Sequence, residues 1–179
     1  MTTYSGKIAN FTIYEFLEVP IIYNRVKASK TLTSLTVYLK KYVSKIYALA
    51  YFAGGVCLFL NGNAKLLSYM ALPFIVLCYT LVMRKMIGRK RSFSALDIKP
   101  LLGHDNNGSC PSNHSAASMI IALSLADIHP ILGAVFIALS LLTGTSRIAA
   151  GVHYPLDVSL GRLIAIAVKC IHIAARAVI

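Results

Sequence analysis

Acidic residues are scarce in this sequence, and charged residues of either sign are few. Asp and Glu number 6 against 18 Lys and Arg, and charged residues make up 13% of the chain. Soluble proteins carry roughly a quarter charged residues, so this composition argues for a membrane protein. The net charge of +12 does not indicate nucleic-acid binding, because 57% of the residues are hydrophobic. Anionic lipid headgroups and a phosphate-bearing substrate account for the basicity better.

Metal-binding and secretion signals are also lacking. The four cysteines show no paired spacing of the kind that holds a metal ion. The first 20 residues contain Glu15 and Glu18 and no apolar core, so we expect no signal peptide there. The 179 residues are enough for one domain with a sizeable core.

Long uncharged runs predict membrane-spanning helices. The runs 46–64 and 128–146 have 19 residues each, and 66–83 has 18, with His129 as the only histidine among them. Each run is about long enough to cross a bilayer core as a helix. The run 111–126 and the less apolar segment 158–179 bring the expected number of transmembrane helices to about five.

The last of these segments carries a stripe of basic residues. Arg162, Lys169, His172 and Arg176 fall along one side of a helix. We interpret them as residues that reach the headgroups or face other parts of the protein. The alternative is a surface for a helical partner or for anionic headgroups.

The first 44 residues are amphipathic, and Pro20 predicts a helix break. We expect residues 1–44 to form one or two interfacial helices and residues 45–179 to form a membrane bundle. A sixth transmembrane helix at 8–26 is the alternative, and Glu15 and Glu18 argue against it. The expected fold class is therefore all-α, a polytopic membrane helical bundle with an N-terminal interfacial helix.

Three polar blocks interrupt the apolar runs. They are the basic cluster 84–91, the tetrapeptide Pro-Ser-Asn-His at 111–114, and the segment 146–157 with sequence SRIAAGVHYPLD. Two predicted helices separate the basic cluster from the third block, so all three blocks reach one membrane face. Arg91 and Arg147 can bind phosphate oxygens bidentately. His153 can attack as a neutral imidazole oriented by Asp157, with His114 as general acid.

These blocks resemble the signatures of the type 2 phosphatidic acid phosphatase superfamily, which includes vanadium haloperoxidases and bacterial acid phosphatases. The third signature, Ser-Arg-x5-His-x3-Asp, is matched completely by Ser146, Arg147, His153 and Asp157. The second, Pro-Ser-Gly-His, is matched with Asn113 in place of glycine.

The first signature, Lys-x6-Arg-Pro, is matched less closely. Arg91 fits the arginine, but Ser92 replaces the proline and Arg84 stands where the lysine is expected. We assign phosphate contacts to Arg84 and Arg91, with Lys85 as a substitute for Arg84.

The resemblance implies an acid phosphatase-like helical bundle and a phosphohistidine on His153. His114 is then the acid for the leaving group and Asp157 the partner of His153. Ser112, Asn113 and Ser146 join the arginines in binding phosphate, with amides at a helix start as anion donors. No cofactor and no metal are expected. A gating role for His104 and Asp105 is the alternative to a solvated loop.

The expected substrate is a lipid whose phosphate sits at headgroup level. We rank polyprenyl (undecaprenyl) diphosphate first, before phosphatidic acid and phosphatidylglycerol phosphate. The expected partners are this substrate and membrane lipids, with no nucleic acid, and the sequence leaves homo-oligomers open. A bacterial plasma membrane is the expected location. Basic residues favour a cytoplasmic site, whereas recycling of a carrier lipid at the cell surface requires the outer face; both remain open.

Two other classes of function remain. A weakened lipid-phosphate binding or scaffold protein is suggested by the altered first block and predicts binding without turnover. A small transporter or assembly subunit is suggested by the basic last helix and predicts no effect of His153→Ala. A vanadate-dependent peroxidase is disfavoured because those relatives are soluble and larger.

Overall fold

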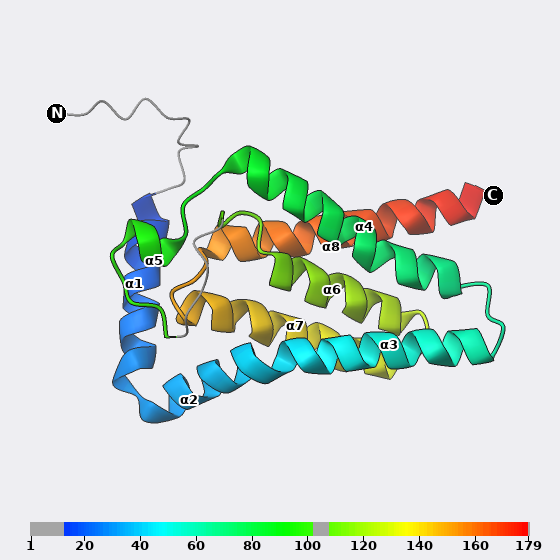
Figure 1. Ribbon diagram of the computed structural model, residues 1–179, viewed down its shortest axis with the longest axis horizontal. Coiled ribbons are helices and arrows are strands. Elements are labelled where there is room, and N and C mark those ends of the chain that lie inside the picture. Colours follow the sequence, from blue (N-terminus) through cyan, green and yellow to red (C-terminus); the bar gives the residue numbers. More distant parts are fainter. Residues whose placement is uncertain (1–12, 102–107, 179) are drawn as a thin grey trace.

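The computed structural model describes residues 13–101 and 108–178, and Figure 1 shows that most of them form helices. The helices are α1 (Ile13–Ala28), α2 (Lys30–Tyr38), α3 (Ser44–Leu60), α4 (Leu66–Ile87), α5 (Ser92–Ala95), α6 (Asn113–Ala126), α7 (Pro130–Ala149) and α8 (Pro155–Val178). A π-helical turn, η1 (Leu39–Val43), joins α2 to α3. The all-α fold class expected from the sequence is confirmed.

Four stretches of the described residues are long and apolar enough to cross a membrane. They are Lys30–Leu60, Leu66–Ala95, Pro130–Ala149 and Pro155–Val178. A fifth spanning helix at 111–126 stays a prediction, because α6 has only 14 residues and is not among these four. At 1.5 Å per residue such a helix is about 21 Å long, against about 30 Å for the bilayer core.

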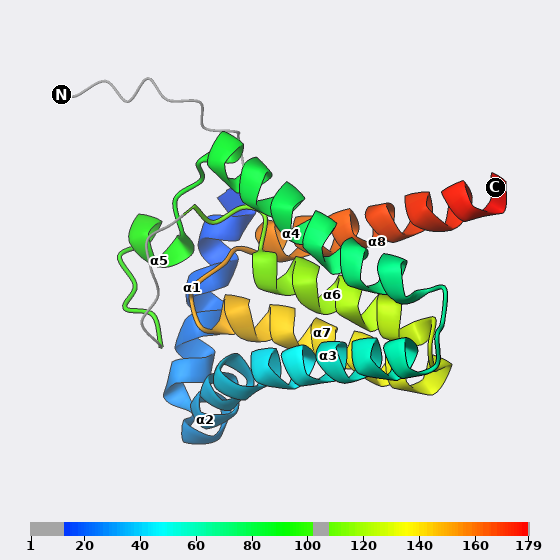
Figure 2. The same ribbon diagram turned by 45° about the vertical axis from the view of Figure 1, so that its right-hand side comes forward.

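The N-terminal half of the bundle begins earlier than the charge pattern suggested. The sequence placed a boundary after residue 44, because Lys40, Lys41 and Lys45 interrupt the apolar run. In the structure, α2, η1 and α3 form one unbroken stretch, Lys30–Leu60. Helix α1 runs in a different direction and crosses one end of the bundle steeply in both views (Figures 1 and 2). The predicted break at Pro20 is wrong, because α1 continues through that residue.

The short helix α6 lies at the centre of the bundle, where it contacts α3, α4, α7 and α8 (Figure 2). Its inward side chains are mostly small, including the buried Ala116, Ser118 and Ala122. Small residues let membrane helices approach closely. At Gly161 of α8, a Cβ would lie 2.6 Å from the carbonyl oxygen of Ser112. Glycine at this position therefore lets the start of α8 pack against the start of α6.

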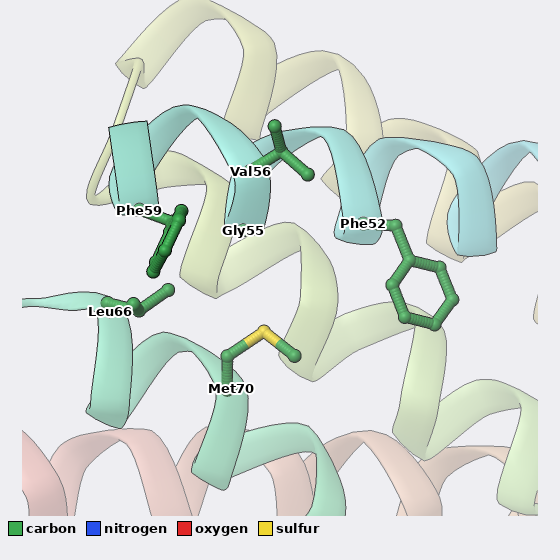
Figure 3. Close-up of a pocket in the computed structure, with 6 residues that line it drawn as sticks. All are labelled: Phe52, Gly55, Val56, Phe59, Leu66 and Met70. Carbon is green, nitrogen blue, oxygen red and sulfur yellow. The ribbon is translucent and has the colours of Figure 1, made fainter. Parts of the chain in front are cut away.

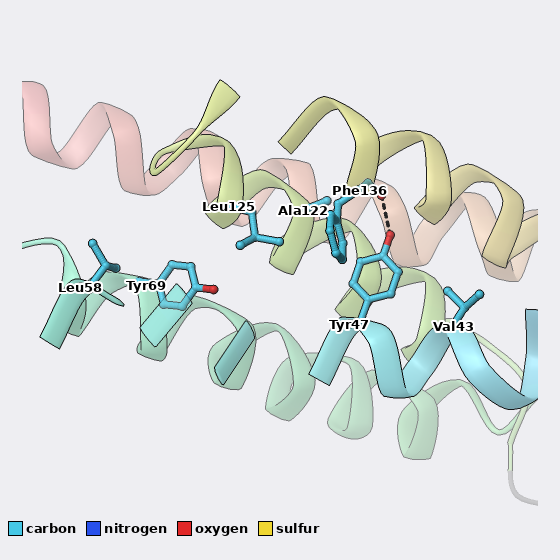
Figure 4. Packing of buried hydrophobic residues seen from close by; sticks show 7 residues of the cluster. All are labelled: Val43, Tyr47, Leu58, Tyr69, Ala122, Leu125 and Phe136. Carbon is cyan, nitrogen blue, oxygen red and sulfur yellow. Dashed lines mark hydrogen bonds between the residues drawn. The ribbon is translucent and has the colours of Figure 1, made fainter. Parts of the chain in front are cut away.

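A core of aromatic and aliphatic side chains joins α3, α4, α6 and α7 (Figure 4). The Tyr47 hydroxyl donates a hydrogen bond to the carbonyl oxygen of Phe136, and the two rings meet edge to face at 5.1 Å. An edge-to-face pair of this kind adds about 0.5–1.5 kcal/mol to the burial of the rings. The pair fixes α3 against α7 and so holds η1 near the end of α7.

Two basic residues of α8 face other helices. Arg162 donates hydrogen bonds to the carbonyl oxygens of Leu141 at 2.8 Å and Ser140 at 3.2 Å, both in α7. Lys169 is buried and forms an ion pair with Asp127, just after α6. The interpretation that the stripe faces protein is therefore confirmed for these two residues.

An apolar cavity of about 330 Å³ lies between α3 and α4 (Figure 3). It is lined by Phe52, Gly55, Val56, Phe59, Leu66 and Met70. These residues flank the α3–α4 turn, at the opposite end of the bundle from α1 (Figure 1). The cavity is therefore remote from the three polar blocks.

Candidate active site

The three polar blocks meet at the end of the bundle that α1 crosses, because a helix ends or begins in each of them. Gly88 caps α4 in the left-handed conformation, with φ of 59°, and turns the chain toward Arg91 at the start of α5. Ser112 precedes α6, and Arg147 lies in the last turn of α7. Pro155 begins α8, a position that suits proline because the first helical N–H needs no partner.

His153 and Asp157 form a buried pair, with exposed side-chain fractions of 1% and 0%. Nδ1 of His153 lies 3.4 Å from Oδ2 of Asp157. The first turn of α8 brings the two residues together, as their four-residue spacing predicted. The backbone N–H of Tyr154 also donates to Oδ2, at 3.0 Å.

The second ring nitrogen of His153 faces a guanidinium group. Nη1 of Arg91 lies 3.3 Å from Nε2 of His153, and Arg91 is buried. An arginine N–H can only donate, so Nε2 must accept in this contact and Nδ1 carries the proton. The ring therefore directs its N–H to Asp157 and its lone pair toward the cationic side of the site.

Burial lowers the pKa of His153, because the charged imidazolium loses its hydration. The hydrogen bond from His153 to Asp157 and the negative charge of Asp157 oppose this shift, and the positive charges of Arg91 and Arg84 add to it. The net direction is downward, so the imidazole is neutral at pH 7. A neutral imidazole is the form that can act as a nucleophile.

Two residues that the sequence did not single out bind Asp157. Nη1 of Arg89 lies 2.9 Å from Oδ1 of Asp157, and the guanidinium stacks over the Tyr154 ring at 3.9 Å. The hydroxyl of Ser109 donates to Oδ2 and lies 3.5 Å from Nδ1 of His153. Arg89 belongs to the basic cluster, but nothing in the spacing distinguished it, and Ser109 lies outside the family pattern.

Serine at the family's proline position has a structural role. Ser92 is fully buried and donates a hydrogen bond of 2.9 Å to the carbonyl oxygen of Gly151. Gly151, with φ of 70°, turns the chain between Arg147 and His153. The Ser92 hydroxyl thus ties the first block directly to the third.

The predicted phosphate ligands Arg147 and Arg84 both lie at the site. Nη2 of Arg147 is 3.5 Å from the Ser44 hydroxyl, and Nη2 of Arg84 donates to the carbonyl oxygen of Pro111 at 2.8 Å. The Nε atoms of both arginines and Oδ1 of Asn113 are buried without a hydrogen-bond partner among the described residues. Buried polar groups are normally satisfied, so these atoms are available to bind a polar ligand.

Two predicted ligands are engaged within the protein. The N–H of Ser112 donates to the carbonyl oxygen of Asp157 at 2.9 Å, and its hydroxyl accepts from Ser115 at 3.1 Å. The Ser146 hydroxyl donates to the carbonyl oxygen of Thr143 at 2.7 Å. These bonds anchor α6 to α8 and close the last turns of α7.

The other predicted residues differ in their placement. His114 is half-buried as the second residue of α6, at the end of that helix that meets the site. Lys85 is in the last turn of α4, and the structure does not bring it into the buried group. His104 and Asp105 lie outside the described residues.

The match to a known family covers most of the chain. Residues 46–177 match the PAP2 superfamily, a match that spans all three polar blocks. The chain belongs to the PAP2 superfamily. The resemblance inferred from the three signatures is therefore confirmed, and the protein is a phosphatase.

Two curated relatives come from Bacillus species. One, named undecaprenyl-diphosphatase BcrC of Bacillus subtilis, is 30% identical over 140 residues, which cover 76% of this chain and 70% of the relative. The other, named bacitracin transport permease protein BcrC of Bacillus licheniformis, is 30% identical over 109 residues, covering 58% and 52%.

Two solved PAP2-like structures share the fold. LpxE of Aquifex aeolicus superposes with a TM-score of 0.74 at 24% identity, covering 93% of this chain and 99% of that structure. A PAP2-type phosphatidylglycerolphosphate phosphatase of Bacillus subtilis gives 0.65 at 21% identity, covering 92% and 89%. Together with the apolar helices, these findings identify a bacterial membrane phosphatase of the PAP2 superfamily.

Proposed function

We propose that this phosphatase hydrolyses a polyprenyl diphosphate, with undecaprenyl diphosphate as the first candidate, through a phosphohistidine at His153. The observation that carries the mechanism is the position of the His153 ring between Asp157 and Arg91. The relative named undecaprenyl-diphosphatase supports the substrate class. Phosphatidic acid and phosphatidylglycerol phosphate are the alternative substrates.

In the first step, Nε2 of His153 attacks the terminal phosphorus. The N–P bond forms as the bond from phosphorus to the leaving oxygen breaks, and the electron pair stays on that oxygen. The ring becomes positively charged, and Nδ1–H continues to donate to Asp157. A buried carboxylate next to an imidazolium stabilises the charge that develops during attack.

The cations of the site bind the phosphoryl oxygens. Arg91 and Arg147 are both 2% exposed, so their bonds to phosphate form in a place largely shielded from water. Guanidinium groups can bind two phosphate oxygens at once. The Nε groups of Arg147 and Arg84 are further donors, because they lack partners within the described protein. The side-chain amide of Asn113, whose Oδ1 also lacks a partner there, can turn its NH2 group to the phosphate.

His114 acts as the acid for the leaving group and then as the base for water. In the second step, water attacks the phosphorus, the N–P bond breaks, and His114 accepts the water proton. In the first step His114 gives its proton to the leaving oxygen, so the proton taken from water returns His114 to its starting form. Orthophosphate leaves, and His153 returns to its neutral form.

We propose that α1 lies in the headgroup region, as the interfacial part of residues 1–44. Its direction across the end of the bundle supports this (Figures 1 and 2). Ile21 and Ile22 are exposed on α1, whereas Val19 and Tyr23 are buried against the protein. Tyr23 donates to the carbonyl oxygen of Lys99 at 2.6 Å. The lipid phosphate then reaches the site while its tail stays in the bilayer.

The test is phosphate release by the full chain in detergent, with EDTA present. Undecaprenyl diphosphate, phosphatidic acid and phosphatidylglycerol phosphate are compared, and we expect the highest kcat/KM with the diphosphate. His153→Ala and His114→Ala should lose most of the activity, whereas His172→Ala, at the far end of α8, should retain it. Substrate binding without release of phosphate would support the scaffold alternative.

A further inference from the structure

A lysine outside the three family blocks lies beside the phosphate site. Lys40 belongs to the π-helical turn η1 and is half-buried, whereas its neighbour Lys41 is exposed. A π turn inserts one residue into a helix and so rotates the side chains before it relative to those after it; such turns are frequent at functional sites. Here the turn interrupts a stretch that is otherwise α-helical from Lys30 to Leu60.

The surroundings of η1 connect it to the third block. η1 packs against α7, and one helical step after Lys40 the Ser44 hydroxyl lies 3.5 Å from Nη2 of Arg147. Lys40 interacts electrostatically with Arg147 and with Arg91. Cations from three separate parts of the chain therefore lie in the same region of the protein.

A lysine ammonium near these two arginines adds a further cation to the phosphate site. Arg91 and Arg147 are assigned above to the oxygens of the phosphoryl group that His153 attacks. A diphosphate carries a second phosphoryl group, which becomes the leaving group when the terminal phosphorus is attacked. Negative charge collects on the oxygens of a leaving phosphate, so a neighbouring cation stabilises it in addition to the proton that His114 donates.

We propose that Lys40, with Ser44, forms a subsite for the lipid-linked phosphate of a diphosphate substrate. The lysine stabilises the charge that collects on the bridging oxygen as the bond to the terminal phosphorus breaks. Lys40 therefore selects diphosphates over phosphate monoesters. This inference rests on the proposed function, because it concerns the substrate of the same site.

The experiment compares Lys40→Met with Lys41→Met, which removes an exposed lysine whose ammonium lies over the Tyr42 ring. Both variants are assayed in detergent with undecaprenyl diphosphate and with phosphatidic acid, and inhibition by pyrophosphate and by orthophosphate is measured. Loss of a hydrogen bond to a charged group changes binding by about tenfold to hundredfold. We expect Lys40→Met to lower kcat/KM for the diphosphate, and to weaken pyrophosphate inhibition, by at least about tenfold.

Under the same conditions, we expect Lys40→Met to change kcat/KM for phosphatidic acid and inhibition by orthophosphate less than about threefold, because neither ligand has a second phosphoryl group. Retained activity on phosphatidic acid would show that the variant is folded. Lys40→Arg should restore most of the diphosphate activity, and Lys41→Met should behave as the wild type. Equal losses on both substrates, or no loss on either, would overturn the subsite. A wild-type protein that hydrolyses neither substrate would instead overturn the proposed function.

Discussion

The replacement Asp157→Asn tests the pair on which the mechanism depends. The carboxylate is fully buried and accepts from Arg89, Ser109, the Tyr154 N–H and Nδ1 of His153. An amide of the same shape supplies one acceptor oxygen and one NH2 group. The Ser109 hydroxyl could accept from this NH2 group, but Arg89, the Tyr154 N–H and Nδ1–H of His153 can only donate, so the NH2 group must face at least one of these three without forming a bond.

The expected loss follows from the two charged partners. The neutral amide of the variant can neither pair with the Arg89 guanidinium nor stabilise the imidazolium that forms on His153. Hydrogen bonds to charged groups contribute about 1.5–3 kcal/mol each. If the two contributions overlap in part, the transition state loses roughly 3–4 kcal/mol, which lowers kcat/KM by about 10²–10³-fold.

The assay is steady-state phosphate release from undecaprenyl diphosphate in detergent, with thermal unfolding measured on the same preparation. Asp127→Asn is the matched control, because Asp127 pairs with Lys169 away from the site. The activity of that control should stay within about threefold of the wild type, because Asp127 contacts none of the site residues described above. An Asp157→Asn variant that is folded and keeps about a third of the wild-type activity would refute the reasoning.

Two further outcomes are expected. Burial lowers the pKa of His153 from its usual value of 6.5, so the imidazole is mostly neutral at pH 6.5. As the pH falls, kcat/KM should therefore begin to decrease with a midpoint below that pH. A midpoint at or above pH 6.5 would contradict the shift. Ser92→Ala leaves the carbonyl oxygen of Gly151 without its buried donor, so thermal unfolding should report a loss of about 1–2 kcal/mol relative to the wild type. A variant as stable as the wild type would argue against this role of Ser92.

The part of the site that sequence could predict is the part set by local spacing. His153 and Asp157 are four residues apart, so one helical turn brings them together, and the start of α8 does so. The uncharged runs likewise predicted which segments are helical. They did not give the start of α6, because the uncharged run begins at Pro111 whereas the helix begins at Asn113.

The contacts that sequence missed join residues far apart in the chain. Arg84 was chosen by counting back from Arg91 across six intervening residues, but the left-handed turn at Gly88 leaves Arg84 against Pro111. Arg89, just after that turn, reaches Asp157 instead. Spacing within one block cannot show such pairings, because the packing of α4 against the start of α6 decides them.

Lys40 was interpreted as part of a surface facing the headgroups, for a similar reason. A lysine that interrupts an apolar run is usually solvated, and only the packing of η1 against α7 brings this one near Arg147. The stretch Lys30–Leu60 therefore belongs both to the membrane bundle and to the edge of the site. Its position beside the site became apparent from the structure and not from the charge pattern.

The most direct test of the central claim is to trap the phosphorylated enzyme. Undecaprenyl diphosphate radiolabelled in its terminal phosphate is mixed with the full chain, and the reaction is stopped within milliseconds in alkali. The account predicts label on the protein that is stable in alkali, released in acid and absent from His153→Ala. Phosphate release at the wild-type rate with no label on the protein, or label that persists in His153→Ala, would contradict it.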